Sequence, residues 1–414
     1  MRNFYVDAIQ QFNKLNPGVE IVPEFIGFSD AYPKIQAGIQ AGTPPDIVHS
    51  DAPAYAVLLQ EGLVIPVTGI IKDLGWDKDL LPNLRVTMPD GNIYLLPTWI
   101  EPCFFYYRKD WAQEKGISTP LRSWDEVVAA AKAFTDPSRG RWGIALPLKR
   151  SGRLGFDFYA ILAGLGGHLY NPDKTPAVKT QIFRDTLNIV KRLVEYAPPD
   201  AIEWEYSGVR TGFKTGRVGL HIYQGRTMSE ILGEPFGTYG SGFPQLIDVT
   251  GMQLLPPLNS KDWPRKAIVA VGIEGFTILK TSPYHREAAS FLTWLMGDRR
   301  RYIKMLNTVP FMEAPVLASV VEDPVYWDNP AYKRRPDAAA TLKEAVHQAG
   351  RGPEINIYMD FYQKQGLLIP ESATAQGSLV LDDAILSYVL ENKPIDQVLD
   401  ALQEKLAKLV RGSK

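Results

Sequence analysis

Cysteine is almost absent from this chain, since its 414 residues include only Cys103. A single cysteine cannot form a disulfide within the chain and cannot build a thiolate metal cluster. Cys103 lies in the apolar run 103–107, where we expect a small buried side chain rather than a nucleophile. Disulfide and thiolate chemistry are therefore excluded as organising features.

Long apolar runs are missing as well. No apolar stretch reaches the roughly 18 residues that a membrane-spanning helix needs, so no spanning segment is predicted. The first residues also do not show the basic-then-apolar pattern of a secretory signal.

Charge of one sign is not in excess, because 45 Lys and Arg against 46 Asp and Glu give a net charge of -1. Nucleic acids and anionic membranes both require a basic surface, so neither is expected as the main partner. At 414 residues the chain exceeds what one hydrophobic core usually supports, which predicts two lobes or domains.

Familiar catalytic motifs are absent too. The sequence has no phosphate-binding loop, no His-Glu-x-x-His, no Cys-x-x-Cys and no Gly-x-Ser-x-Gly segment. The five histidines are scattered, so no metal site, Ser–His pair or cofactor is predicted. We do not expect an enzyme, although a carboxylate pair for glycoside hydrolysis stays open among Asp51, Glu101, Asp157 and Glu274.

The stretch 43–51, Thr-Pro-Pro-Asp-Ile-Val-His-Ser-Asp, organises the rest of the chain. A turn at 42–45 ends an amphipathic helix, an apolar-biased run follows, and Asp51 stands where that run ends. Ligands of open α/β sheets bind at the carboxyl ends of strands, which places Asp51 as a ligand group. Aspartate is also a preferred N-cap, and taken alone the start of a helix near Pro53 is the favoured interpretation.

Periodicity predicts the elements on both sides of this stretch. Residues 1–15 are predicted as an amphipathic helix and residues 19–25 as a strand with alternating apolar side chains. A second helix then leads into 43–51, and strand, helix and strand together predict a parallel βαβ unit. The apolar face of the first helix consists of Phe4, Ala8, Phe12 and Leu15.

From about residue 110 the pattern indicates a second lobe. Ser123, with Glu126 three residues later, forms a capping box that opens a helix. Residues 218–223 alternate as a strand that leads into the polar segment 224–226. Further helices are predicted at 183–194, 282–297 and 394–409.

Aromatic and polar side chains occur together at the ends of predicted strands. A sugar presents apolar C–H faces that stack on aromatic rings, and hydroxyls that need donors and acceptors. Trp99 and Glu101 offer that mixture, although Trp99 also suits core packing and Glu101 a solvated loop. The candidates at the end of the 218–223 strand, which also suit an ordinary turn, are Tyr223, Gln224, Gly225 and Arg226.

Glu274 interrupts two apolar runs, 267–271 and 276–279, which are predicted core strands. Burying a carboxylate without a partner is costly, so a ligand, a protein partner or solvent is expected at this point.

Five segments, in their order and spacing, resemble the extracellular solute-binding proteins of ABC importers. The resemblance is to the carbohydrate-binding group that includes the maltose-binding protein family. The segments are 43–51, 58–67, 91–97 (Gly-Asn-Ile-Tyr-Leu-Leu-Pro), 105–110 and 123–126 (Ser-Trp-Asp-Glu).

This resemblance implies an α/β, two-lobed periplasmic-binding-protein fold of type II, with a ligand cleft between lobes joined by a hinge of several strands. It assigns residues 1–108 with 268–312 to an N-terminal lobe, and residues 109–267 with 313–414 to a C-terminal lobe. Family members begin with a strand before the first helix, so an upstream strand and an export signal are expected before Met1.

The implied function is to bind a carbohydrate, expected to be a di- or oligosaccharide, and to deliver it to the permease subunits of an ABC importer outside the cytoplasm. The protein would be a monomer without a cofactor or a metal, and Asp51 would accept hydrogen bonds from sugar hydroxyls. Further contacts are expected from Phe28 and Phe311, at matching family positions, and from Asp157 and Trp204 in the second lobe. Core packing or an exposed loop remains the alternative for these four.

Two other functions stay open on the sequence. A glycerol-phosphate or phosphodiester binder of the same fold would use Arg226 and Arg153 as anion contacts. A carbohydrate-active hydrolase would use Glu101 and Glu274 as its carboxylate pair.

Overall fold

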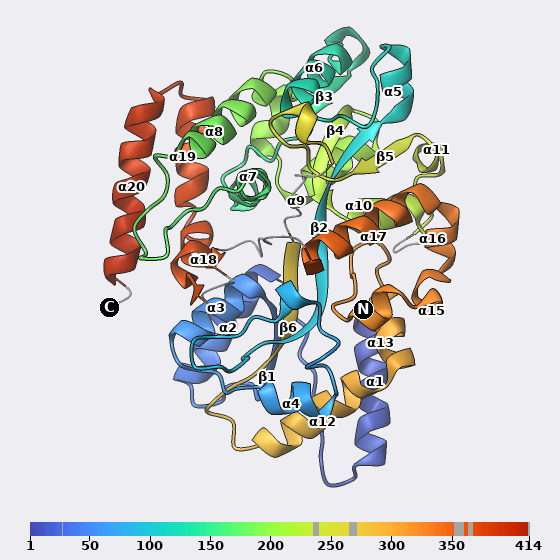
Figure 1. The fold of residues 1–414 in the computed structure, drawn as a ribbon, viewed down its shortest axis with the longest axis vertical. Coiled ribbons are helices and arrows are strands. Elements are labelled where there is room, and N and C mark those ends of the chain that lie inside the picture. Colours follow the sequence, from blue (N-terminus) through green and yellow to red (C-terminus); the bar gives the residue numbers. More distant parts are fainter. Residues whose placement is uncertain (27, 235–239, 265–270, 352–359, 363–366, 413–414) are drawn as a thin grey trace.

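The structure is a computed structural model that describes residues 1–26, 28–234, 240–264, 271–351, 360–362 and 367–412. In this part of the chain, helices surround six connected strands whose order is β1-β6-β2-β4-β3, with β5 pairing β2. Figure 1 shows β1 and β6 in the lower half, β3, β4 and β5 in the upper half, and β2 running between them.

Strand β2 (Leu96–Arg108) is shared by both halves. Its first part pairs antiparallel with β6 up to the pair Pro102 and Val271, and its second part pairs with β4 from Cys103 opposite Gln224. Every residue of β2 except Arg108 is buried, as expected for a strand covered on both faces. Cys103 is among them, which confirms the expected buried side chain. Proline has no N–H to donate to a ladder, and Pro102 stands where β2 changes partner.

Two groups of strands therefore meet on β2. In the lower sheet, β1 (Ile47–Asp51) pairs antiparallel with β6 (Val271–Ile278), which pairs with β2. In the upper sheet, β4 (Val218–Gln224) lies between β2 and β3 (Trp142–Ile144), and β5 (Thr250–Gln253) pairs with β2.

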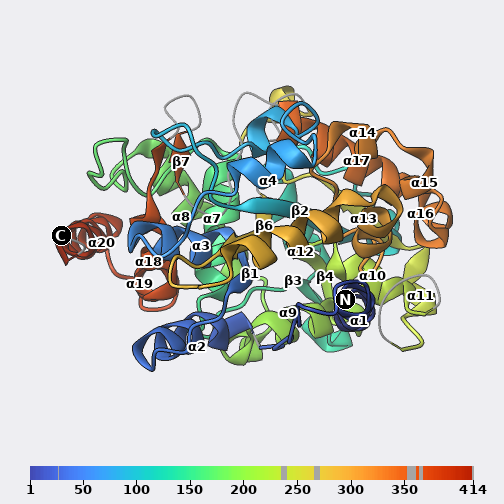
Figure 2. The same ribbon diagram turned by 90° about the horizontal axis from the view of Figure 1, so that it is seen from below.

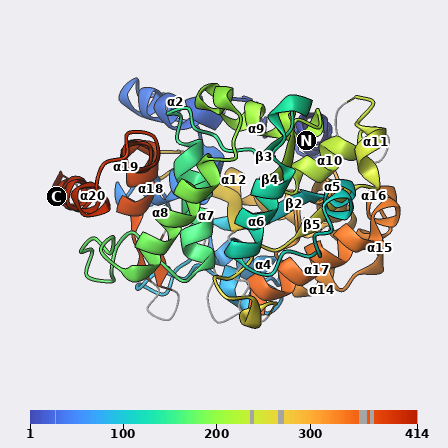
Figure 3. The same cartoon turned by 90° about the horizontal axis from the view of Figure 1, so that it is seen from above.

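Helices cover both sheets. Those before β2 or directly after β6 lie in the lower half of Figure 1 and are α1 (Arg2–Leu15), α2 (Phe28–Gln40), α3 (Ala52–Gln60), α4 (Thr68–Asp73), α12 (His285–Gly297) and α13 (Arg299–Leu306). Those between β2 and β5 are α5 (Lys109–Glu114), α6 (Trp124–Phe134), α7 (Arg153–Gly164), α8 (Gln181–Val194), α9 (Tyr206–Lys214), α10 (Arg226–Leu232) and α11 (Pro244–Ile247). Figure 3 shows α6, α7 and α8 over the upper end of the molecule.

The C-terminal third of the chain runs across both halves. Helix α17 packs against β2 and β5 and also against the turn Pro82–Leu84, whereas α18 lies beside α3 at the other side of the molecule (Figure 2). The elements of this region are α14 (Ala318–Val321), α15 (Pro324–Trp327), α16 (Pro330–Arg334), α17 (Pro336–Arg351), β7 (Phe361–Tyr362), β8 (Leu367–Leu368), α18 (Pro370–Gly377), α19 (Val380–Val389) and α20 (Ile395–Gly412).

Most elements with strong local signals are confirmed. Helix α1 buries Phe4, Ala8 and Phe12, although Leu15, expected on the same face, is 67% exposed. The serine half of the capping box forms, because the Glu126 N–H donates to Ser123 Oγ at 3.2 Å, whereas the Glu126 carboxylate accepts from the Arg122 N–H at 2.7 Å. Local side-chain chemistry is enough to set such helix starts.

The strand predicted at 19–25 is wrong, and so is the parallel βαβ unit built on it. In the described residues β1 pairs only with β6, and that pairing is antiparallel. The side chain of Asn13 instead bonds both the N–H and the carbonyl of Ile21, at 2.9 and 3.1 Å. Without a neighbouring strand the alternating apolar side chains are only partly covered: Val19 and Ile21 are half-buried against the core, and Phe25 is 42% exposed.

No helix in the described part of the chain combines the length and hydropathy that a bilayer crossing needs.

Close packing in the upper sheet generates a first prediction. A Cβ atom at Gly219 in β4 would lie 2.4 Å from the Phe134 ring and 2.7 Å from the Trp111 ring. We expect Gly219→Ala to destabilise the protein by about 1–3 kcal/mol, because these buried rings must shift. Thermal melting of the variant measures the loss.

Gly69→Ala in α4 is the matched control, since no atom lies within 4 Å of its added Cβ. It should be neutral or stabilising by up to about 1 kcal/mol. Equal melting temperatures for the two variants would contradict this description of the upper sheet.

Candidate functional site

A row of functional side chains crosses the three strands of the lower sheet. The register pairs Asp51 of β1 with Glu274 of β6, and Glu274 with Trp99 of β2. Residues directly opposite one another point to the same face, so these three side chains lie side by side. Glu101 is two residues further along β2 on the same face, and its Oε1 accepts a hydrogen bond from Trp99 Nε1 at 3.2 Å.

Four carboxyl groups converge around this row. Burial raises the pKa of Glu274 well above its ordinary value, and the charges of Glu101, Asp51 and Glu313 raise it further. Burial also raises the pKa of Glu101 and of Asp51 to about 6, and it raises that of Glu313. The raised pKa favours the protonated form of Glu274, which donates a hydrogen bond to Glu101. The sequence placed Glu274 between two strands, whereas it lies inside β6.

Asp51 serves two purposes at once. It is the N-cap of α3, because its Oδ1 accepts a hydrogen bond from the Ala54 N–H at 3.2 Å. The predicted cap is therefore confirmed, and the same carboxylate lies next to Glu274 in the sheet.

His49 fills the space behind the row. Its ring lies 4.7 Å from the Trp99 ring and 4.6 Å from the Phe276 ring, and its Nδ1 is 3.6 Å from Glu274 Oε2. Burial lowers the pKa of His49 to about 3, so it is neutral at physiological pH. Trp99 is only 3% exposed, and its indole is a packed wall of the cluster.

The row and the groups around it form one wall of the candidate site. A second wall is formed by side chains of the upper half of the molecule. Arg153 of α7 pairs with Asp157 at 2.5 Å, and both side chains are almost fully buried. The Arg153 guanidinium also lies over the Tyr223 ring at 4.1 Å and donates to Gln224 Oε1 at 3.4 Å. Tyr206 of α9 packs on the same guanidinium, at 5.2 Å. Asp157, Tyr223 and Gln224, all predicted site residues, are thus brought together by one arginine.

The second wall lies within electrostatic reach of Asp51. Burial raises the pKa of Tyr206 to about 12, and the carboxylate charge of Asp51 contributes to that rise. Asp51 is therefore close enough to influence a side chain of the upper half while it belongs to a strand of the lower sheet.

Gly225 and Arg226 close the same region from the end of β4. A Cβ at Gly225 would lie 1.9 Å from the carbonyl oxygen of Phe311, so only glycine permits this backbone contact. Arg226 donates to Met312 Sδ at 3.4 Å, and its charge lowers the pKa of Glu101 against the larger effect of burial. It is a cation that faces the carboxyl cluster.

The remaining predicted site residues are Phe311, Trp204 and Phe28. Phe311 is fully buried, and its ring packs against Tyr332 at 5.0 Å. Trp204 is 8% exposed and covers Gly212, where a Cβ would lie 2.5 Å from the indole. Phe28 begins α2, and its side chain is outside the described part of the structure.

Sequence reasoning missed His49, Tyr206, Glu313 and Tyr5 as members of the cluster. His49 had a signal, because it precedes Asp51 by two residues on one strand and so shares its face. Tyr5 had none, since it reaches His49 (6.1 Å between rings) only through the packing of α1 on the sheet.

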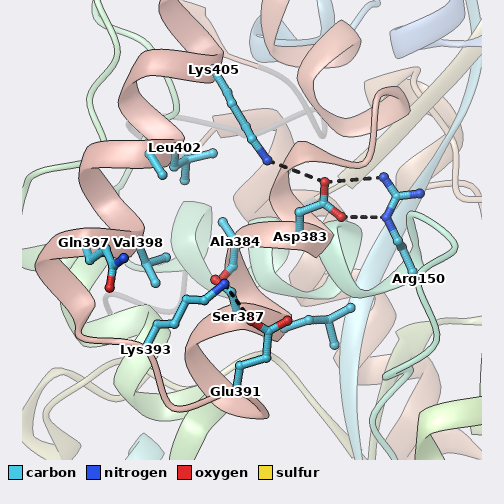
Figure 4. A pocket seen from close by; sticks show the side chains of 12 residues that line it. Arg150, Asp383, Ala384, Ser387, Glu391, Lys393, Gln397, Val398, Leu402 and Lys405 are labelled. Carbon is cyan, nitrogen blue, oxygen red and sulfur yellow. Dashed lines mark hydrogen bonds and ion pairs between the residues drawn. The ribbon is translucent and has the colours of Figure 1, made fainter.

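A separate hollow lies between α19 and α20 (Figure 4), with a volume of about 390 Å³. Asp383 at its rim pairs with Arg150 at 2.5 Å and with Lys405 at 3.6 Å. The converging carboxyl groups and the arginine wall are not part of its lining. In the described residues no group of three or more His, Cys, Asp and Glu side chains is arranged to hold a metal ion.

Comparison with known proteins gives a family and a fold. The family described as bacterial extracellular solute-binding protein matches residues 1–299. A binding protein of Brucella abortus (strain 2308) is 24% identical over 221 residues, which are 53% of this chain and 54% of that protein. The chain thus spans about half the length of the curated relatives it matches first.

Two solved structures of ABC transporter solute-binding proteins share the fold over nearly the whole chain. One, from Thermotoga lettingae and bound with α-D-tagatose, has a TM-score of 0.76 at 17% identity and covers 98% of this chain and 95% of that chain. Another, from Agrobacterium radiobacter in complex with ribitol, has a TM-score of 0.75 at 21% identity, with the same coverage of 98% and 95%. The predicted two-lobed α/β fold is confirmed, and the chain belongs to the bacterial extracellular solute-binding protein family.

Proposed function

We propose that this protein binds a carbohydrate between its two lobes and delivers it to the permease subunits of an ABC importer, outside the cytoplasm. The lobes we propose are residues 1–108 with 268–312, and residues 109–267 with 313–414. The hinge includes β2, which pairs with strands of both lobes. The family is one of binding proteins, and we propose no catalytic role.

The observation that carries this proposal is the convergence of two polar walls on Asp51. One wall offers the carboxyl oxygens of Asp51, Glu101 and Glu274, which accept hydrogen bonds from hydroxyls. The other offers the ring of Tyr206 and the guanidinium of Arg153, which suit C–H faces and hydroxyl oxygens. The two walls therefore offer complementary groups to a bound sugar.

A sugar that contacts both walls requires the two lobes to close. The two walls belong to different lobes, so a sugar contacts both only when the lobes approach, and bound sugar stabilises the closed state. The names of similar structures, bound to tagatose and ribitol, support a ligand rich in hydroxyls. Ligands from a single sugar or polyol to the expected di- or oligosaccharide fit this chemistry.

The charges of the site disfavour a phosphate ligand. Arg153 already pairs with Asp157, and Arg226 faces Glu101 within a cluster of carboxyl groups. A phosphate would meet repulsion there, whereas a neutral sugar would not.

The site geometry also disfavours a glycoside hydrolase. Glu101 and Glu274 share a hydrogen bond. Two hydrogen-bonded carboxyl groups lie closer together than the catalytic pair of a glycosidase, whose carboxyl groups are roughly 5 Å or more apart.

The test is a thermal-shift screen with ribitol, D-mannitol, D-tagatose, maltose and maltotriose, and with glycerol 3-phosphate as the anionic comparison. A ligand present at about 100 times its dissociation constant should add roughly 2.7 kcal/mol and raise the melting temperature. We expect one of the sugars or polyols to do so and to be recovered unchanged.

Asp51→Asn should abolish most of that shift while the α3 cap survives, because asparagine is also a good N-cap. Asp298→Asn, at the cap of α13, is the matched control and should keep the full shift. A shift only with glycerol phosphate, or consumption of the sugar, would overturn the proposal.

A polar site of this kind also costs stability. The pKa of Glu101 rises from 4.5 to about 6, so between those pH values the folded protein holds more protons than the unfolded chain. Stability is therefore lost as the pH rises through this window, by about 2 kcal/mol above pH 6. Glutamine does not ionise, so the free energy of unfolding of Glu101→Gln at pH 8 should be about 2 kcal/mol higher than that of the parent. The variant should also bind sugar more weakly.

Urea unfolding of both proteins at pH 8 and pH 4 measures this difference, which should vanish at the lower pH. Glu404→Gln on the exposed face of α20 should gain nothing at either pH. A gain for Glu101→Gln that does not depend on pH would show that ionisation is not its cause.

A further inference from the structure

Helix α18 packs against α3, although the two helices belong to different proposed lobes. Figures 1 and 2 both show them side by side, at the side of the molecule away from α17. Helix α18 is anchored in the C-terminal lobe, because it also packs against α19 and α20. The α3–α18 contact therefore bridges the lobes.

A buried carboxylate lies in this contact. Glu371, the second residue of α18, is 2% exposed. Its Oε1 accepts a hydrogen bond from Gln60 Nε2 of α3 at 3.4 Å and one from Lys174 Nζ at 2.7 Å. Lys174 belongs to the same lobe as Glu371, so Gln60 is the residue that carries the polar contact from one lobe to the other.

Helix α3 connects this contact to the ligand site. Asp51 caps the N-terminus of α3, and Gln60 is the last residue of that helix. A helix of nine residues is a rigid element about 13 Å long, so the two ends move together. Movement of Asp51 towards a ligand thus moves Gln60 as well.

We propose that α3 and α18 form a clasp that holds the two lobes closed, with Glu371 as the residue that positions it. This inference rests on the proposed function, in which the two lobes close on a sugar. The α3–α18 contact would stabilise the closed state both with and without sugar. Its strength sets the fraction of protein that is closed before ligand arrives. Apparent affinity scales with that fraction, so the clasp tunes binding from outside the ligand site.

Gln60 allows a test in both directions, because its side chain is exposed and can be replaced without disturbing the core. Gln60→Glu places a carboxylate against buried Glu371 and should weaken the clasp. Gln60→Lys places a cation there and should strengthen it. A partly exposed charge pair is worth up to about 1 kcal/mol, which is roughly fivefold in affinity.

The control is Gln36→Glu. Gln36 donates to Glu61 at 2.7 Å, so the same substitution meets the same kind of partner, but within one lobe. Each variant is titrated with ribitol, D-mannitol and maltose by calorimetry. The radius of gyration of the sugar-free protein is measured by small-angle X-ray scattering at low and at high salt.

We expect Gln60→Glu to bind roughly fivefold more weakly and to be more expanded without sugar, and Gln60→Lys to change both in the opposite sense. The differences should shrink at high salt, and Gln36→Glu should stay within about twofold of the parent. If both Gln60 variants change affinity and radius of gyration in the same direction, or change them no more than Gln36→Glu does, the clasp is overturned. If no sugar binds, the proposed function fails, and the scattering still decides on the clasp.

Discussion

The structure depends on one strand that serves two sheets. Strand β2 is buried along nearly its whole length and exchanges its ladder partner β6 for β4 between Pro102 and Cys103. A buried strand must keep its hydrogen bonds, so neither half of the molecule can separate from the other at this point. The proposed closure on a ligand would change the angle between the halves about β2 without breaking this connection.

The same strand fixes where the site lies. Trp99 and Glu101 precede the change of partner, and Tyr223 and Gln224 on β4 pair with the residues that follow it. The residues of both walls therefore lie close to the point where β2 changes its partner. Gly225, which packs against the backbone of Phe311, is one point of close contact between the proposed lobes.

The site is built from groups that are expensive to bury. Glu101, Glu274, Asp51 and Glu313 crowd together with Arg226, and burial raises the pKa of all four acids. Protonation of Glu274 relieves part of the repulsion, and a hydrogen-bonding ligand would relieve more. Such an arrangement is hard to explain by stability alone, since apolar residues would pack there at lower cost.

Local signals in the sequence predicted the helix starts, the strands β1 and β4, and the family. They also predicted Asp51 and Glu101 as ligand contacts, because the sequence alone shows polar residues at the ends of predicted strands. The site itself depends on cross-strand register, and no sequence pattern shows that Asp51, Glu274 and Trp99 form one row. Trp99 and Phe311 illustrate the limit, since an aromatic side chain predicted as a ligand contact is equally suited to packing.

Residues 19–25 have the alternating apolar pattern of a strand but have no neighbouring strand to pair with, which explains why the predicted strand does not form. A strand forms where a partner offers its backbone, and in the described residues the side chain of Asn13 meets Ile21 instead. Tyr5 and Glu313 reached the cluster through tertiary packing, which propensity does not encode.

Hydrogen–deuterium exchange with and without the sugar identified by screening tests the central claim most directly. If the ligand lies between the lobes, exchange should slow in β2 and β6 of one wall and in β4 and the start of α10 of the other, at the same sugar concentration. Protection confined to one lobe, or centred on the hollow between α19 and α20, would contradict a site shared by both lobes.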